Sequence, residues 1–158
     1  MVQEIINVVK RGIRGKEPLN IEKIHDMVEY AVEDISGVSS SQVEMQSGLQ
    51  FYDGMSTDEI QQILIKSAAD LISLENPNYQ YVAARLLLYS LRKQVIDKLW
   101  DHPHIYEHTK KCIEKGVYDP SILESYEKKD FDRMENWINH NRDYDFTYAG
   151  LRQVIDKY

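Results

Sequence analysis

The sequence has little cysteine, proline and glycine, and these scarcities exclude several classes of protein. Its single cysteine, Cys112, allows no internal disulfide bond and no zinc site built from several thiolates. Only 4 prolines and 7 glycines occur in 158 residues, so a collagen-like chain is excluded. Hydrophobic residues make up 42% and charged residues 28%, values typical of a folded globular domain rather than a disordered chain.

Long apolar runs and a positive net charge are also missing. No apolar segment approaches the roughly 20 residues of a membrane-spanning helix, and the first residues lack the basic and apolar segments of a signal peptide. We therefore expect a cytoplasmic protein with no membrane partner. The 19 Lys and Arg against 26 Asp and Glu give a net charge of −7, which argues against direct nucleic-acid binding, because that needs a basic face.

The first third of the chain departs from this acidic balance. Five cations between residues 10 and 23 face only two glutamates there, and they are Lys10, Arg11, Arg14, Lys16 and Lys23. Such a cluster can hold a small anion, although a solvated surface loop is its commoner meaning. The segment 12–17 is not a P-loop, because its glycines are too close and Glu17 stands where a magnesium-binding Ser or Thr would be.

Hydrophobic periodicity predicts a mainly α fold for residues 1–97. Two short β-type runs, residues 4–9 and 16–19, flank a glycine turn and predict a β-hairpin. Asn20 is a credible N-cap, and Ser56 with Glu59 has the capping-box pattern. The predicted helices span roughly 21–35, 41–52, 57–75 and 79–99. We expect the short hairpin to cap this four-helix bundle, with the leucines at 86–88 making the fourth helix central.

The remainder, residues 98–158, predicts additional short helices. They span roughly 103–115, 119–126, 130–138 and 146–158, with a polar stretch at 139–143. Their aromatic faces need a partner surface, and no long bundle or sheet follows to supply one. We expect this second part to be the truncated beginning of a larger helical region.

Catalytic and metal chemistry is not supported by any motif. His104 and His108 lie four apart on one face of a predicted helix, a spacing that can bind zinc. No acidic helper or further ligand accompanies them, so surface histidines are the expected outcome. Cys112 is expected to be an inert, half-buried thiol. We predict no catalytic residue and no metal site.

Several segments resemble the N-terminal ATP-cone region of the large (alpha) subunit of class I ribonucleoside-diphosphate reductase, of the bacterial or bacteriophage type. The segments are 8–15, 19–24, 50–57, 65–72 and 77–86, the last being the most specific. Residues 116–119, 140–143 and 146–149 resemble the first helices of that enzyme's catalytic region. The resemblance therefore covers essentially the whole chain.

This resemblance implies an allosteric module that binds ATP or dATP and regulates overall activity in deoxyribonucleotide synthesis for DNA replication. ATP keeps such an enzyme active, and dATP often switches it off. The parent oxidoreductase needs a thiyl-radical cysteine and a redox-active cysteine pair, which the single Cys112 does not match. We expect the 158 residues to be inactive alone. The implied partners are the remainder of the large subunit and the small radical-bearing subunit.

The resemblance also implies a nucleotide site of eight residues, in which Mg²⁺ accompanies the nucleotide. The phosphate contacts would be Lys10, Arg11, Lys23, Thr57 and Lys93, and the nucleoside contacts Glu17, Asn20 and Ile24. These roles suit the residue types, because Arg offers phosphate two parallel donors and Lys a point charge. Asn20 is an equally good helix cap.

One departure concerns nucleotide specificity. Gln61 occupies a position where many bacterial members have His, and Gln cannot gain a proton as His can. We expect adenine nucleotides to bind with weak discrimination between ATP and dATP. Two alternatives stay open: a nucleotide-free helical interaction module, or a cone from a nucleotide-sensing regulator. The second would carry a zinc ribbon with paired cysteines, for which this sequence has no C-x-x-C.

Overall fold

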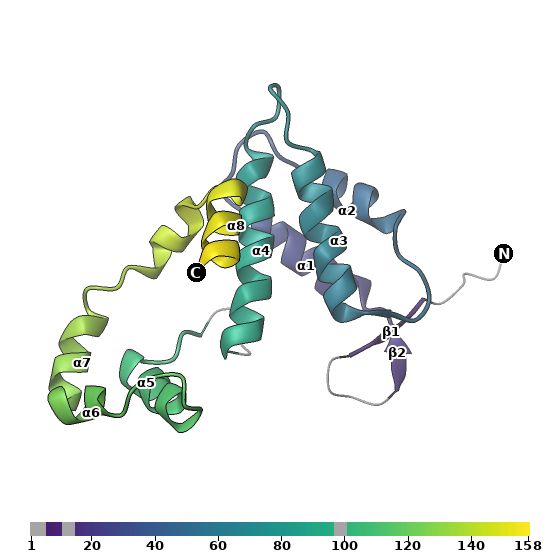
Figure 1. Ribbon diagram of the computed structural model, residues 1–158. Helices are drawn as coiled ribbons and strands as arrows, with labels where there is room; N and C mark the ends of the chain where they lie inside the picture. Colours follow the sequence, from purple (N-terminus) through teal and green to yellow (C-terminus); the bar gives the residue numbers. More distant parts are fainter. Residues whose placement is uncertain (1–5, 11–14, 97–100) are drawn as a thin grey trace. The chain divides into compact units, whose positions relative to one another are not determined.

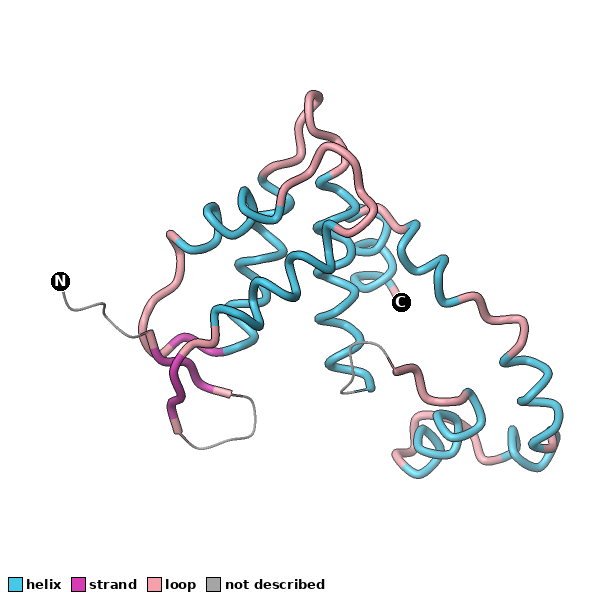
Figure 2. Tube along the Cα trace, turned by 180° about the vertical axis from the view of Figure 1, so that it is seen from behind, coloured by secondary structure: helices cyan, strands magenta, loops and turns pink. Residues whose placement is uncertain are grey.

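The computed structural model describes residues 6–10, 15–96 and 101–158, and the chain forms two compact units. The first unit comprises residues 1–91 together with 144–158, and the second comprises residues 92–143. The predicted hairpin turn, with Gly12 and Arg11, lies outside the described residues. Figure 2 shows a mainly helical chain with a small sheet near its N-terminus, which confirms the predicted fold class.

The small sheet has three strands rather than the two of a simple hairpin. Strands β1 (Asn7–Val9) and β2 (Lys16–Pro18) pair antiparallel, as the sequence predicts. A third strand, β3 (Met55–Ser56), pairs parallel to β1 on its other side and gives the order β2-β1-β3. This two-residue strand leads directly into the next helix, so it joins the sheet to the helical bundle (Figure 1).

Four helices follow in the predicted order, and they belong to the first unit except for the end of the fourth, from Arg92 onward. They are α1 (Ile21–Val32), α2 (Ser40–Gly48), α3 (Thr57–Asp70) and α4 (Tyr79–Ile96), with the predicted residues 97–99 of α4 outside the described part. Helix α1 ends before the predicted Ile35, where Asp34 adopts a left-handed φ of 59°. Helix α2 ends four residues before the predicted Tyr52, because the chain turns there to reach β3.

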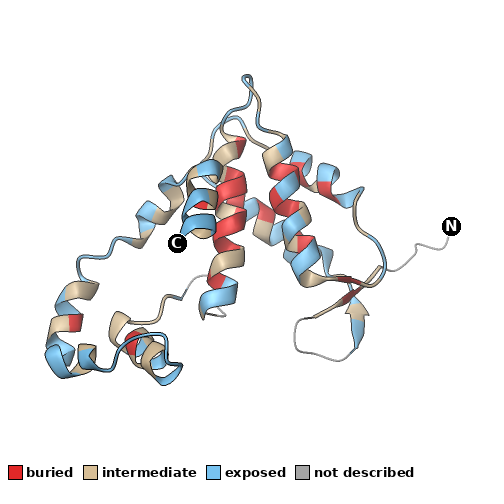
Figure 3. Cartoon of the chain, in the orientation of Figure 1, coloured by how far each residue is buried: buried red, intermediate tan, exposed pale blue. Residues whose placement is uncertain are grey.

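The core of the first unit is centred on α4, whose buried residues run along most of its length (Figure 3). Leu86, Leu87 and Leu88 are all buried, which confirms the central place predicted for this helix. Helix α3 supplies Leu64, Ile65 and Ala68 to the same core, and Val28 of α1 is fully buried. The last helix, α8 (Tyr148–Lys157), also belongs to this unit and buries Leu151.

The second unit is built from shorter elements close to their predicted places. They are α5 (Ile105–Glu114), α6 (Ser121–Ser125) and α7 (Lys128–Glu135). Helix α7 begins two residues earlier than predicted, because the Asp130 carboxylate accepts from the Glu127 amide at 3.0 Å. The predicted polar stretch forms a 3₁₀ helix, η1 (His140–Asp145).

No helix among residues 6–10, 15–96 and 101–158 combines the length and apolar character needed to cross a bilayer.

Candidate functional site

Lys10 and Thr57 are brought together by the parallel pairing of β1 and β3. Val9 is paired with Ser56, so the next residue of each strand, Lys10 and Thr57, leaves the sheet in the same direction. Glu17 joins them from β2, and its Oε1 lies 2.7 Å from Lys10 Nζ. Three residues predicted as nucleotide contacts therefore gather at one end of the sheet.

The Lys10–Glu17 ion pair is half-exposed, with 38% and 46% of the two side chains accessible. An exposed pair of this kind contributes about 0–1 kcal/mol to stability. Exchanging Glu17 for a phosphate oxygen at Lys10 would therefore cost little, because a phosphate also accepts a charge-assisted hydrogen bond from an ammonium group. The same exchange would release the Glu17 carboxylate to accept hydrogen bonds from another group.

Asn20 and Lys23 lie near the opposite end of β1, because β2 runs antiparallel to it and leads into α1. The Asn20 Oδ1 atom accepts from the Lys23 backbone amide at 3.0 Å, so Asn20 is the N-cap of α1. This bond uses the amide oxygen and leaves the Asn20 NH₂ group out of the cap. The Lys23 side chain is exposed, and Ile24 is buried.

An open apolar cavity of about 240 Å³ adjoins this end of α1. Leu19, Ile21 and Ile24 contribute to its wall, and they flank Asn20 in the sequence. His25 and Glu44 also line it, and their side chains are 2.7 Å apart. An apolar wall beside an amide group can pack against a planar ring while the amide bonds its edge.

The start of α3 has the predicted capping box. Ser56 Oγ accepts from the Glu59 amide at 3.1 Å, and the Glu59 carboxylate accepts from the Ser56 amide at 2.7 Å. Thr57 is thus the first helical residue, half-buried at a helix N-terminus, where anions are favoured. One turn later, Gln61 Nε2 donates to the Leu86 carbonyl of α4 at 2.9 Å, a contact that the sequence did not predict.

The structure does not place two further predicted contacts, Lys93 and Arg11, relative to this group. Lys93 is exposed in the last turn of α4 and belongs to the second unit. Arg11 lies outside the described residues. The structure therefore gathers Lys10, Glu17 and Thr57 at one end of the sheet and leaves these two unplaced relative to them.

Asp53 is a supporting residue that the sequence suggested only as a helix end. Its Oδ1 accepts from the backbone and side-chain amides of Asn7, at 2.8 and 2.9 Å, and its Oδ2 lies 3.1 Å from Lys16 Nζ. These hydrogen bonds, those from Asn7 first, lower the pKa of Asp53 to about 2. The adjacent Gly54 has a φ of +86°, and a Cβ there would lie 3.1 Å from Lys16 Nζ. Asp53 and Gly54 therefore tie the start of β3 to β1 and β2.

Comparison with known proteins identifies this architecture. The ATP cone domain family matches residues 6–94. Over 142 residues, or 90% of the chain, the sequence is 44% identical to ribonucleoside-diphosphate reductase 1 subunit alpha of Escherichia coli. It is 43% identical over 143 residues to the alpha subunit of Haemophilus influenzae, and 39% identical over 158 residues to that of phage T4, which is 98% of the chain.

These relatives are much longer proteins. The chain covers 18%, 19% and 20% of the E. coli, H. influenzae and T4 subunits, so it spans about a fifth of their length. The match lies in their N-terminal region. The family match alone includes more than half of the chain and contains the sheet and helices α1 to α3 complete. The chain therefore belongs to the ATP cone domain family.

Proposed function

We propose that residues 6–94 bind ATP or dATP as an allosteric effector and so regulate the overall activity of a ribonucleoside-diphosphate reductase large subunit. The family match over this segment is the observation that carries the proposal. The sheet end with Lys10, Glu17 and Thr57 supports it, because it combines an exposed cation with a helix N-terminus. An effector acts only if it binds the active and inactive states with different affinity.

In this proposal the triphosphate is held mainly by cations. Lys10 exchanges Glu17 for a phosphate oxygen, while Thr57 contributes the N-terminus of α3. Arg11, Lys23 and Lys93 supply the remaining positive charge. A magnesium ion held by the nucleotide's phosphates would offset their repulsion from the acidic side chains of this otherwise acidic protein.

The nucleoside is recognised by the polar and apolar groups at the start of α1. Asn20 uses its NH₂ group, which the helix cap does not engage, to donate to the nucleoside. Glu17, released by Lys10, accepts from an adenine amino group or a ribose hydroxyl. Ile24 packs against the base from the apolar wall of α1.

Gln61 sets a weak discrimination between ATP and dATP in this proposal. Its side-chain amide is already bonded to the Leu86 carbonyl, which links α3 to α4. A neutral side chain held in this way offers no titratable charge to the nucleotide, unlike a histidine at the same place. Clearly different affinities for the two nucleotides, or clear dATP inhibition of the full enzyme, would contradict this part.

The remaining assignments concern the longer protein. We propose that residues 1–97 are the regulatory domain and that residues 98–158 begin the helical N-terminal part of the catalytic region. The partners would be the rest of the large subunit and the small radical-bearing subunit, in the cytoplasm. With Cys112 as its single cysteine, the 158-residue chain would not reduce a ribonucleotide by itself.

Isothermal titration calorimetry of the whole 158-residue chain tests the nucleotide site. ATP and dATP should bind in the micromolar range in the presence of Mg²⁺, and GTP should not. The double variant Lys10→Ala/Arg11→Ala should lose this binding, because it removes two phosphate cations. Repeating the ATP titration with EDTA should weaken binding if Mg²⁺ accompanies the nucleotide.

A matched control distinguishes loss of the proposed site from a general effect of removing two positive charges. Lys128 and Lys129 are an adjacent exposed pair in α7, and Lys128→Ala/Lys129→Ala makes the same change of two charges. This control should bind ATP like the unaltered chain. Equal ATP affinity in both double variants would contradict the site, and absence of binding in the unaltered chain would favour a helical interaction module.

A further inference from the structure

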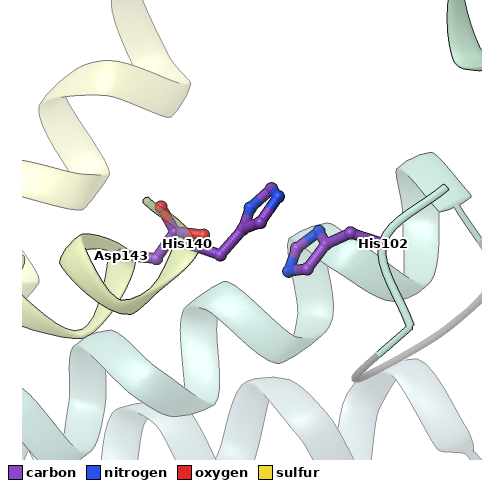
Figure 4. Close-up of side chains that lie close together, drawn as sticks. All are labelled: His102, His140 and Asp143. Atoms are coloured by element: carbon purple, nitrogen blue, oxygen red, sulfur yellow. The ribbon is translucent and has the colours of Figure 1, made fainter. Parts of the chain in front are cut away.

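A cluster of three side chains of metal-binding type lies in the second unit, and none of the three is among the residues proposed for the nucleotide (Figure 4). His102 lies in the segment before α5, and His140 and Asp143 lie on η1. The two imidazole rings are stacked, with centroids 3.9 Å apart and planes inclined by 6°. All three side chains are half-buried. We propose that His102, His140 and Asp143 form a zinc-binding site.

The composition of the cluster suits zinc. Two imidazoles and one carboxylate form a common protein set of three ligands for Zn²⁺, which takes water as the fourth. One ligand atom from each residue lies within 4.8 Å of the other two. Three such atoms lie within about 2.8 Å of a common point (4.8 divided by √3), and zinc bonds are about 2.0–2.2 Å long. Each ligand atom would therefore have to approach the common point by under about 1 Å, in addition to a rotation of one imidazole ring.

The two histidines need one rotation to bind the ion together. In stacked rings the nitrogen lone pairs lie in parallel planes, so one ring must turn until both lone pairs meet at the metal. Rotation about the second side-chain torsion of histidine is soft. His102 and His140 are both half-buried, so neither ring is fully enclosed by the core.

The charges around the cluster are compatible with a divalent cation. Asp143 brings a negative charge to the cluster itself, and Asp101 is the neighbour of His102 in the sequence. Arg92, 6% exposed, binds Asp143 Oδ2 at 2.8 Å, which leaves Oδ1 for the metal and fixes the carboxylate as an outer partner would.

His104 and His108, the pair whose spacing in the sequence could bind zinc, do not form such a cluster. His104 Nδ1 accepts from the Tyr106 amide at 3.2 Å, and its Nε2 lies 3.2 Å from Asp132. His108 Nε2 contacts Cys112 Sγ at 3.4 Å. Both ring nitrogens of His104 are therefore engaged, whereas His102 and His140, far apart in the sequence, are in contact.

Zinc titration of the whole chain tests the proposal, with Zn²⁺ itself as the probe. Calorimetry should show one ion per chain, and the imidazole resonances of His102 and His140 should shift in the NMR spectrum. His102→Asn and His140→Asn should each weaken zinc binding at least about tenfold, because each removes a direct ligand.

His108→Asn and Cys112→Ser are the controls, because they change a contact between a histidine and a thiol in the same unit that involves none of the three proposed ligands. Both variants should bind zinc like the unaltered chain. Cobalt bound in place of zinc should give an absorption spectrum without a thiolate charge-transfer band. A circular dichroism spectrum like that of the unaltered chain would show that each His→Asn variant is folded.

The result that would overturn the proposal is equally direct. Zinc binding that survives in folded His102→Asn, or that disappears in His108→Asn or Cys112→Ser, would place the ion elsewhere. Absence of any zinc binding at pH 7.5 would also overturn it. Loss of nucleotide binding has no bearing on this test, because the three ligands are separate from the proposed nucleotide contacts.

Discussion

Each of the two units of the chain is stabilised internally by a different kind of interaction. The first unit buries apolar side chains from its sheet, from α1 to α4 and from α8. In the second unit, Phe131 is the one buried apolar side chain among the described residues, accompanied by the buried polar residues Arg92 and Thr109. Ion pairs such as Arg92–Asp143 and aromatic contacts also hold this unit, and the ring centroids of Tyr106 and Phe131 are 5.3 Å apart.

This difference predicts which unit unfolds more easily. Apolar burial contributes about 25 cal/mol per Å², whereas exposed ion pairs contribute little and depend on salt and pH. The first unit should therefore set the global stability of the chain. The second should open at lower free energy, as regions with few buried apolar contacts do.

The largest effect should come from truncating the core of the first unit. Leu64 is 0% exposed in α3, and Leu64→Ala should lower the free energy of unfolding by about 2–5 kcal/mol. Leu74, 97% exposed, is the control, and Leu74→Ala should change it by less than about 0.5 kcal/mol. Urea titration followed by circular dichroism measures both, and similar losses would contradict the assigned core.

A smaller and local effect is expected in the second unit. Phe131→Leu keeps an apolar side chain but loses the edge contact with Tyr106, so it should cost about 1–2 kcal/mol, less than truncation to Ala. Amide hydrogen exchange should accelerate in α5 and α7 and stay unchanged in α3. Faster exchange throughout the chain would show that the two units unfold as one.

The capping box of α3 allows a comparison of two serines at helix starts. Ser56 accepts a capping hydrogen bond, and Ser56→Ala should cost about 1 kcal/mol. Ser39 is the N-cap of α2 without such a bond from its side chain, so Ser39→Ala should cost less than about 0.5 kcal/mol. Thermal unfolding of the two variants measures the difference, which would vanish if the cap were unimportant.

Acid should lower the stability of the first unit, because protonation of Asp53 weakens its hydrogen bonds to Asn7 and Lys16. The pKa of Asp53 is about 2 in the folded chain, because Asn7 and Lys16 bond its carboxylate, against about 3.9 when unfolded. Its contribution is therefore complete above about pH 4 and is lost as the pH falls toward 2. Asp53→Asn should flatten the fall of the urea midpoint between pH 4 and pH 2. An unchanged slope would contradict this assignment.

The smallest effect contrasts one histidine in each unit. Glu44 accepts a hydrogen bond from His25 and raises its pKa above 6.5, so this link stabilises the first unit below about pH 6.5 and is lost as the pH rises through the folded pKa. Burial, followed by His140 and Arg92, lowers the pKa of His102, so the second unit loses stability as the pH falls below about 6.5. An NMR titration should give the higher midpoint for His25, and the reverse order would contradict both.

Features that depend on neighbouring residues were predicted well from the sequence. The capping box at Ser56 and Glu59 lies within four residues, and the antiparallel hairpin follows from two short runs around a turn. The helix-starting bond between Glu127 and Asp130 was missed, although an acidic residue three positions on was its available signal.

Features that depend on distant residues could not be predicted in the same way. Two-residue strand β3 is too short for a periodic signal, and its partner Val8 lies far away in the sequence. The bond from Gln61 to Leu86 and the stacking of His102 on His140 have no local pattern either. Within the proposed nucleotide site, the residue types suggested the chemistry, but only the sheet register shows which of them are neighbours.

The parallel pairing of β1 and β3 also bears on the order in which the chain folds. Its partners Val8 and Met55 are 47 positions apart (55 − 8), so the pairing closes a long loop. If α1 and α2 form first, the flexible part of this loop is shorter. Each halving of its length lowers the entropic cost of closing the loop by about 0.6 kcal/mol. We therefore expect the sheet to close after the helices assemble. Substitutions at this pairing should then accelerate unfolding more than they slow folding.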